Sequence, residues 1–78
     1  MINPRAPEPP YRQLAAILRG MIEHGQLKPG EPLPSEAELQ ETYEVSRGTV
    51  RRAMKVLRDE GAAYTVGGRG TYVSEPPK

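Results

Sequence analysis

Apolar residues recur at the spacing of an amphipathic helix in three stretches of the chain. In residues 10–24 they fall at i, i+3, i+4, i+7 and i+8, which places them on one helical face. Residues 35–44 open with Ser35 as an N-cap and Glu38 three positions later, the spacing of a capping box. Residues 46–59 carry another apolar stripe. The pattern predicts three helices, whose inward residues are Leu14, Ile17, Leu18, Met21, Ile22, Ala37, Leu39, Tyr43, Val50, Ala53, Met54 and Leu57.

Proline, glycine and serine mark where these helices begin and end. Pro10 suits a first helical position, because the N–H that proline lacks would have no partner there. Gly25 and Gly61 are placed as stops for the first and third helices. Ser46 is the expected N-cap of the third helix. Between the first two helices, "KPGE" suits a type II turn in which glycine takes the positive φ.

The C-terminal part of the chain has the composition of a strand pair. Residues 64–66 and 71–73 are strand formers, and "GGRG" at 67–70 separates them. Three helices and a hairpin predict a fold that is mainly α with a small β-hairpin. The short connection between the second and third helices is typical of a helix-turn-helix. The expected fold class is therefore a winged helix-turn-helix, with three helices and a two-stranded wing.

The length of 78 residues allows one domain with a small core. The first ten residues contain four prolines, which predicts a disordered arm over residues 1–9. Residues 10–74 form the predicted domain. Residues 75–78, "EPPK", are expected to be a frayed tail or the start of a linker, which favours an excised DNA-binding domain over a stand-alone protein.

Composition excludes several classes of function. Without cysteine the chain has neither disulfides nor thiolate metal sites, and this usage suits a reducing cytoplasm. A lone histidine, His24, makes a metal site improbable. The sequence offers no plausible nucleophile–base pair, so we expect neither an enzyme nor a cofactor. Its apolar runs are far shorter than a membrane span, and the N-terminus lacks a signal-peptide core.

Two parts of the chain carry opposite net charges. The sum over residues 1–44 is −3, whereas residues 45–74 carry +4, against +1 for the whole chain. Five basic side chains lie between Arg47 and Arg58 with no acidic residue among them. Such asymmetry indicates a nucleic-acid or acidic-membrane partner. The alternative is a solvated helix face, which is the commoner origin of a charge run.

A helix that reads DNA needs one buried face and short polar or basic groups near its N-terminus, because the major groove admits a single helix. Residues 46–59 meet both needs, and Gly48, without a side chain, would allow close approach to the DNA. The expected base or adjacent phosphate contacts are Arg47, Thr49 and Arg51. Backbone contacts or plain surface are expected for Arg52, Lys55 and Arg58.

The hairpin tip and the second helix complete this hypothesis. Arg69 on the glycine-rich tip can enter a minor groove or clamp a phosphate, as a wing does. The exposed side of the second helix is acidic and repels DNA, so we expect it to point away from the duplex. Its members are Glu36, Glu38, Glu41 and Glu44.

The segment "LPSEAELQETYEVSRGTVRRAMKVLRDEGAAYTVGGRGTYV" resembles the winged helix-turn-helix domain of GntR-type bacterial transcriptional regulators. With "YRQLAAILRGMIEHGQLKPGEPLPSE" before it, the resemblance covers about residues 10–74. "LPSE", "VSRGTVRRA" and "GRGTYV" occur in the order and spacing of the family, and their joint match is highly specific. The segment "PPYRQL", where the first helix is predicted to begin, is similar to the corresponding segment of the HutC-like branch of the family.

The resemblance implies specific contacts with DNA. In the family an arginine that contacts DNA often follows "LPSE", but Ala37 stands there in this chain, so that contact is absent. Gly48 occupies a position where threonine, alanine or a larger residue is common, which places one base contact in doubt. The family positions that carry over are Ser35 in "LPSE", Ser46, Arg47, Gly48, Thr49 and Arg51 in "SRGTVR", and Gly68 and Arg69 at the wing tip.

The resemblance also implies partners and a biological role. It implies a repressor that forms a homodimer on a near-palindromic double-stranded operator in the cytoplasm, with an effector bound by a further domain absent from this chain. A protein-interaction module is the competing function, because fold alone does not fix function. Low, salt-insensitive DNA affinity would favour that alternative.

Overall fold

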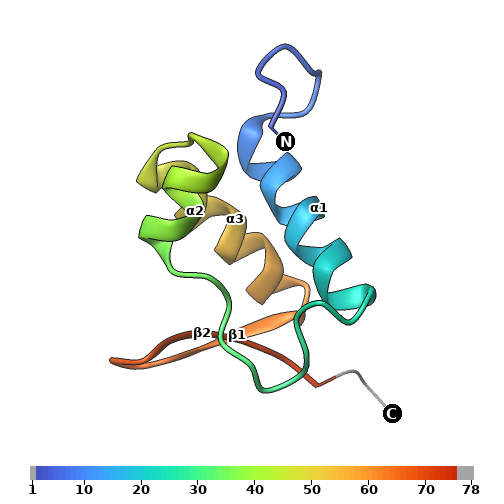
Figure 1. Ribbon diagram of the computed structural model, residues 1–78, viewed down its shortest axis with the longest axis vertical. Helices are drawn as coiled ribbons and strands as arrows, with labels where there is room; N and C mark the ends of the chain where they lie inside the picture. The colour runs from blue at the N-terminus through green and yellow to red at the C-terminus, as the bar shows by residue number, and fades with distance from the viewer. Residues whose placement is uncertain (1, 76–78) are drawn as a thin grey trace.

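The computed structural model describes residues 2–75. The elements follow the chain in the order α1 (Pro10–Glu23), α2 (Glu36–Tyr43), α3 (Arg47–Asp59), β1 (Ala63–Val66) and β2 (Gly70–Val73). α3 packs against both α1 and α2, and the hairpin projects beyond the helices at the opposite end from the N-terminus (Figure 1). This is the predicted winged helix-turn-helix.

The helix boundaries agree with the signals in the sequence. α1 begins at Pro10, and Gly25 follows its end with a φ of +78°. Gly30 takes a φ of +83° in the predicted turn, where the Glu31 N–H donates to the Lys28 carbonyl at 3.0 Å. The Ser35 hydroxyl accepts a hydrogen bond from the Glu38 N–H at 3.1 Å and caps α2.

The turn between α2 and α3 needs only three residues, 44–46. Glu44 ends α2 in the left-handed region, with a φ of +53°, and its N–H donates to the Gln40 carbonyl. Ser46 then caps α3, because its hydroxyl accepts a hydrogen bond from the Thr49 N–H at 3.1 Å. This sharp turn places the N-terminus of α3 directly after the C-terminal end of α2.

Replacing Ser46 with alanine should lower the free energy of unfolding by about 1 kcal/mol, because the Thr49 N–H loses its capping acceptor. Urea denaturation measures the difference. Thr42→Ala, an exposed change on α2, serves as the control and should stay within about 0.5 kcal/mol of the parent. Equal stability of the two variants would contradict the capping role.

The core lies between the three helices and the inner side of the hairpin. All four predicted stripe residues of α3 are buried, and Val50, Ala53 and Leu57 have no exposed surface. The prediction for α2 was wrong at Ala37, which is exposed, because the short helix turns only Leu39 fully inward. The buried residues are Leu14, Ala15, Leu18, Leu33, Leu39, Val50, Ala53, Met54, Leu57, Ala63 and Val73.

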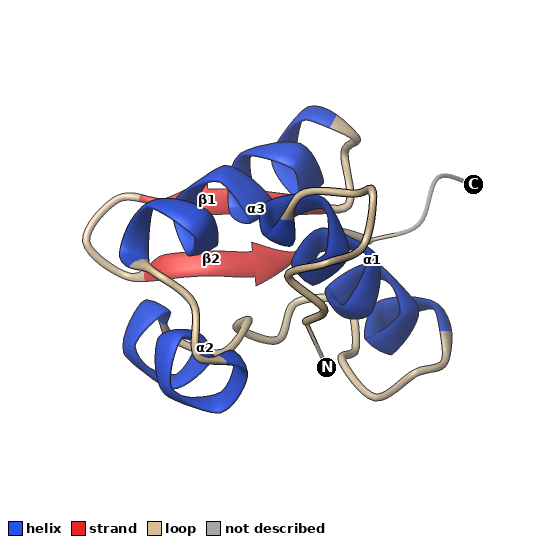
Figure 2. Ribbon diagram, turned by 90° about the horizontal axis from the view of Figure 1, so that it is seen from above, coloured by secondary structure: helices blue, strands red, loops and turns tan. Residues whose placement is uncertain are grey.

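The wing gains a further pairing partner from the loop before α2. β1 and β2 are antiparallel, with Ala63 opposite Val73 and Tyr64 opposite Tyr72, and lie side by side in Figure 2. Residues 30–33 pair with the other edge of β2 through three backbone hydrogen bonds of 2.9 Å, with a bridge between Pro32 and Tyr72. These bonds fasten the wing to the segment that leads into α2.

The N-terminal arm, which the sequence predicted to be disordered, contacts α1 through one side chain. Residues 2–9 form turns that fold back on α1. The Gln13 side-chain amide accepts from the Asn3 N–H at 2.7 Å and donates to the carbonyls of Asn3 and Glu8. Ile2 packs against the core cluster. One glutamine therefore satisfies backbone groups that a run of prolines leaves without helical partners.

The predicted tail over 75–78 falls largely outside the described residues, which end at Glu75. In the described part of the chain, no helix combines the length and the apolarity needed to cross a membrane.

Candidate nucleic-acid interface

The first turn of α3 presents polar groups above a buried anchor. Arg47 and Gly48 are exposed, and a Cβ atom placed on Gly48 would lie 3.9 Å from its nearest neighbour, the Ser46 Oγ. Ser46 also donates its hydroxyl to Thr49 Oγ1 at 3.0 Å. Val50 is fully buried beneath them. The turn is therefore rigid on its inner side and open on its outer side.

A carboxylate from α2 reaches the two arginines of this turn and the next. Glu36 Oε2 accepts a hydrogen bond from Arg51 Nε at 3.1 Å, and Glu36 Oε1 lies 3.4 Å from Arg47 Nε. The sequence predicted only that the acidic side of α2 faces away from DNA, and it did not anticipate that Glu36 would pair with basic residues of α3. Glu36 is the first residue of α2, and its side chain spans the distance to the first two turns of α3.

The other basic residues of α3 have different partners. The Arg52 guanidinium lies over the Tyr11 ring, 4.0 Å from its centroid, so α1 orients this side chain. Lys55 pairs with Asp59 at 2.8 Å, one turn further along the helix. Arg52 and Lys55 are both exposed, although Tyr11 is half-buried, and a phosphate could compete for either cation.

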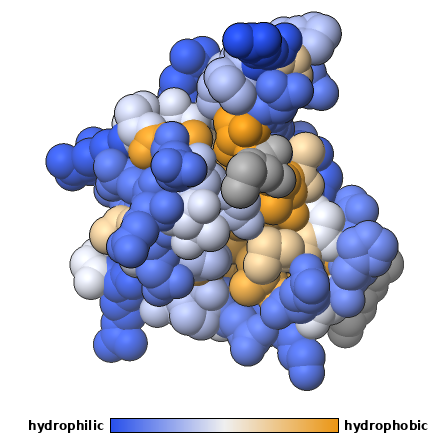
Figure 3. All heavy atoms as spheres, turned by 45° about the horizontal axis from the view of Figure 1, so that its top comes forward, coloured by the Kyte–Doolittle hydropathy of each residue, from blue (hydrophilic) through white to orange (hydrophobic). Residues whose placement is uncertain are grey.

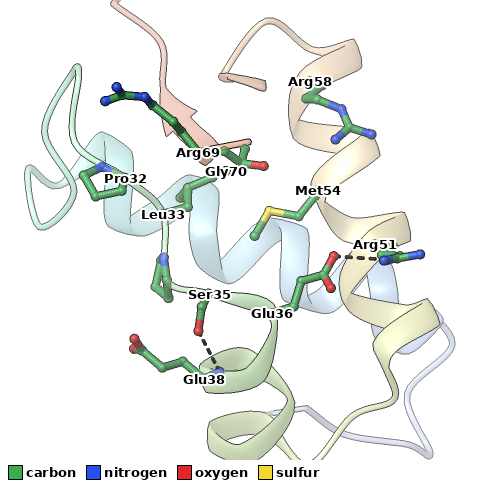
Figure 4. Close-up of a pocket in the computed structure, with 12 residues that line it drawn as sticks. Pro32, Leu33, Ser35, Glu36, Glu38, Arg51, Met54, Arg58, Arg69 and Gly70 are labelled. Atoms are coloured by element: carbon green, nitrogen blue, oxygen red, sulfur yellow. Dashed lines mark hydrogen bonds and ion pairs between the residues drawn. The ribbon is translucent and has the colours of Figure 1, made fainter. Parts of the chain in front are cut away.

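A groove of about 670 Å³ separates the helix-turn-helix from the wing. Figure 4 shows Met54 on its floor, with Ser35 and Glu36 on the side of α2 and Arg69 on the side of the wing. Arg51 reaches it from α3. Of the predicted site residues, this groove gathers Ser35, Arg51 and Arg69.

Ser46 and Thr49 lie elsewhere. They line a second hollow, beside Ile2, Pro4 and Tyr43, where the N-terminal arm meets the turn before α3. Five of the ten predicted site residues thus line these two hollows, and the other five line neither: Arg47, Gly48, Arg52, Lys55 and Gly68.

The wing tip is a tight turn built on glycine. Gly68 has a φ of +75°, which a residue with a Cβ rarely adopts, and the Arg69 N–H donates to the Val66 carbonyl at 3.0 Å. The turn carries Arg69 at its exposed end. Behind it, Arg58 of α3 donates to Thr65 Oγ1 at 3.0 Å and ties the hairpin to the helix.

The surface is polar around these features. On the face drawn in Figure 3, hydrophobic residues form a few small areas among hydrophilic ones. Among residues 2–75 the only large hydrophobic residue classed as exposed is Tyr64, stacked on Tyr72 with ring centroids 6.0 Å apart. The same residues contain no group of three His, Asp or Glu side chains placed to hold a metal ion.

Sequence reasoning missed Glu36 and Tyr11 as parts of this surface, and it named Arg58 without its partner Thr65. For Glu36 a signal was present, because a helix-turn-helix brings the start of its first helix close to its second. No signal in the sequence indicated the pairing of Tyr11 with Arg52 or of Arg58 with Thr65, since each pair joins two different elements.

The profile of the bacterial regulatory proteins of the gntR family matches residues 10–73, which is most of the chain. This chain belongs to the GntR family. Among its relatives, the HTH-type transcriptional repressor NagR of Bacillus subtilis is 47% identical over 75 residues. That alignment covers 96% of this chain but 31% of NagR, so the chain spans less than a third of the relative's length.

Solved structures of GntR-family proteins have the same fold. YtrA from Sulfolobus acidocaldarius is 35% identical with a TM-score of 0.89, over 99% of this chain and 81% of that one. The DNA-binding domain of AraR, solved in complex with operator ORR3, is 34% identical with a TM-score of 0.82, over 95% of this chain and 93% of that one.

Proposed function

We propose that this GntR-family chain binds double-stranded DNA sequence-specifically, as the reading domain of a transcriptional repressor. The carrying observation is α3, whose inner face is buried at Val50, Ala53 and Leu57 while Arg47 and Arg51 stay exposed beside it. A helix anchored in this way can enter a groove without losing its place in the fold. The 34% identical AraR domain in complex with its operator supports the proposal.

The dimensions of α3 suit the major groove of B-DNA. Its 13 residues span about 20 Å, and the groove is about 12 Å wide. The basic residues within the helix attract phosphate, and its N-terminal backbone N–H groups favour an anion. In our proposal Arg47, Thr49 and Arg51 read bases or the nearest phosphates, and Ser46 and Gly48 let the first turn approach closely.

The remaining predicted residues position the domain on the duplex backbone. Ser35 lies at the N-terminus of α2, where a phosphate could meet free helical N–H groups. Arg52 and Lys55 would exchange their present partners for phosphates. Gly68 and Arg69 would place the wing at the minor groove or the backbone.

We further propose a homodimer on a near-palindromic operator, because two reading helices on half-sites about one helical turn apart match a two-fold symmetric site. An effector would bind outside this chain, which spans 31% of NagR. In our proposal the chain regulates genes in the cytoplasm and is not an enzyme. The relative NagR, which is a transcriptional repressor, supports this role.

Selection of bound sequences from a random duplex pool, followed by salt titration of the best duplex, tests this function. We expect one enriched motif and a slope of log Kobs against log salt of about −2.7 to −4.5 for each domain, from roughly three to five phosphate contacts. If the selection enriches no sequence and binding is weak and insensitive to salt, the proposal is contradicted and a protein partner is favoured.

Replacing Arg69 with alanine should weaken binding to the selected duplex and to a scrambled duplex by similar factors. The reason is that a wing-tip arginine at the backbone contributes affinity without reading bases. Fluorescence anisotropy with both duplexes measures the two factors, and the salt slope should fall in magnitude by about 1. A change in the preferred bases would overturn this assignment.

A further inference from the structure

Glu36 contacts Nε of both arginines that we assign to base reading, through a hydrogen bond to Arg51 and an ion pair with Arg47. Its Oε1 lies 3.4 Å from Arg47 Nε, and its Oε2 accepts from Arg51 Nε at 3.1 Å. Within residues 2–75, the Nη atoms of Arg47 and Arg51 donate no hydrogen bond to another side chain. Each guanidinium therefore keeps its terminal Nη1–Nη2 edge for a ligand.

That free edge matches one base in particular. Guanine presents two acceptors, N7 and O6, to the major groove, and arginine binds them with two parallel N–H donors. A free arginine can also use its Nε–Nη edge, and phosphate accepts either edge from many directions. Holding Nε removes one of the two edges and limits the rotamers of a long side chain that is otherwise mobile.

The negative charge of Glu36 weakens the attraction of the two arginines to phosphate. One carboxylate between two guanidinium groups leaves a net charge of +1 where the two arginines alone would carry +2. Attraction to any nearby phosphate is weakened, whatever the base sequence. A site that orients the two arginines and attracts the DNA backbone less strongly discriminates better between base sequences. It also binds non-specific DNA more weakly.

We propose that Glu36 is a positioning residue that sets base specificity, by fixing Arg47 and Arg51 through Nε and offsetting their attraction to phosphate. This inference rests on the proposed function. A purely structural role does not explain the arrangement, because the Glu36 side chain is 41% exposed and those of Arg47 and Arg51 are 64% and 56% exposed. Exposed ion pairs contribute little to stability.

Glu36→Gln tests the inference, with Glu38→Gln as the matched control. Both residues lie in the first turn of α2 and both changes remove one negative charge, but only Glu36 pairs with the arginines in the described residues. Dissociation constants are measured for the selected duplex and for a scrambled duplex of equal length, at one salt concentration. The specificity ratio is the dissociation constant for the scrambled duplex divided by that for the selected duplex.

We expect Glu36→Gln to bind the scrambled duplex more tightly and to lower the specificity ratio by at least about fivefold, as for one weakened bidentate contact. Glu38→Gln should shift both constants together and keep the ratio. Equal ratios for the two variants would overturn the inference. If the parent chain shows no preference for any duplex, the proposed function fails, and that outcome is separate from this one.

Glu36→Asp separates reach from charge. It keeps the negative charge but shortens the side chain by one methylene, so it cannot span both arginines as Glu36 does. We expect a lower specificity ratio without tighter binding to the scrambled duplex. A ratio equal to that of the parent would show that charge alone matters and would overturn the positioning role. Thermal melting of each variant confirms that it is folded.

Discussion

Replacing Leu57 with alanine is expected to lower the free energy of unfolding by about 2–5 kcal/mol, because it leaves a cavity in a closely packed core. Leu57 has no exposed surface and lies where α3 meets the rest of the core. A domain of this size is only marginally stable, so the loss is a large fraction of the total. Urea denaturation at 25 °C, followed by circular dichroism, measures it.

The neighbouring residue supplies a control for this prediction. Val56 lies on the same helix but is only partly buried, so Val56→Ala should cost clearly less than Leu57→Ala. Similar losses for the two variants would mean that the stability of α3 does not depend on its buried stripe. DNA binding by the Leu57 variant should fall in parallel with its folded fraction, because the reading helix exists only in the folded domain.

Replacing Arg51 with alanine should weaken binding to the selected duplex by about 1–3 kcal/mol, or about 5- to 150-fold, and relax the base preference at one position. The reason is geometric. Arg51 lies one turn after Arg47 on the exposed side of α3, and its Nε is already held by Glu36, so its Nη groups can form a directed pair of hydrogen bonds. Fluorescence anisotropy with the selected duplex and its single-base variants measures both effects.

Lys55→Ala is the matched control, since it removes the same charge one turn further along α3. Lys55 pairs with Asp59, and we assign it a backbone contact at most. Its loss should weaken binding to all duplexes alike and leave the base preference unchanged. If Arg51→Ala binds as tightly as the parent chain at matched salt, the assignment of Arg51 as a base reader is wrong.

Local chemistry explains why much of the fold could be read from the sequence. Helix starts depend on residues within one turn, and the caps at Ser35 and Ser46 form the backbone bonds that their spacing predicts. The buried stripe of α3 follows from a 3.6-residue period alone. The wing likewise depends on strand formers on either side of a glycine turn, and β1 and β2 pair across it.

The arrangement of the residues in the candidate site could not be predicted from neighbouring residues in the sequence. Charge counting placed Glu36 on a solvated acidic face, whereas the structure brings it to Arg47 and Arg51. Residues 30–33 have no strand pattern, yet they pair with β2, because the loop must cross the open edge of the hairpin to reach α2. Proline content gave no indication that Gln13 would bond the backbone of Asn3, because that contact joins residues ten positions apart.

The order, length and caps of the elements and the excess of positive charge along α3 follow from the sequence alone, since each depends on residues close together in the chain. Which acid meets which arginine, and which edge of each guanidinium stays open, depends on the packing of distant elements. Those contacts join elements many residues apart, and their geometry depends on how α2, α3 and the wing pack around one small core.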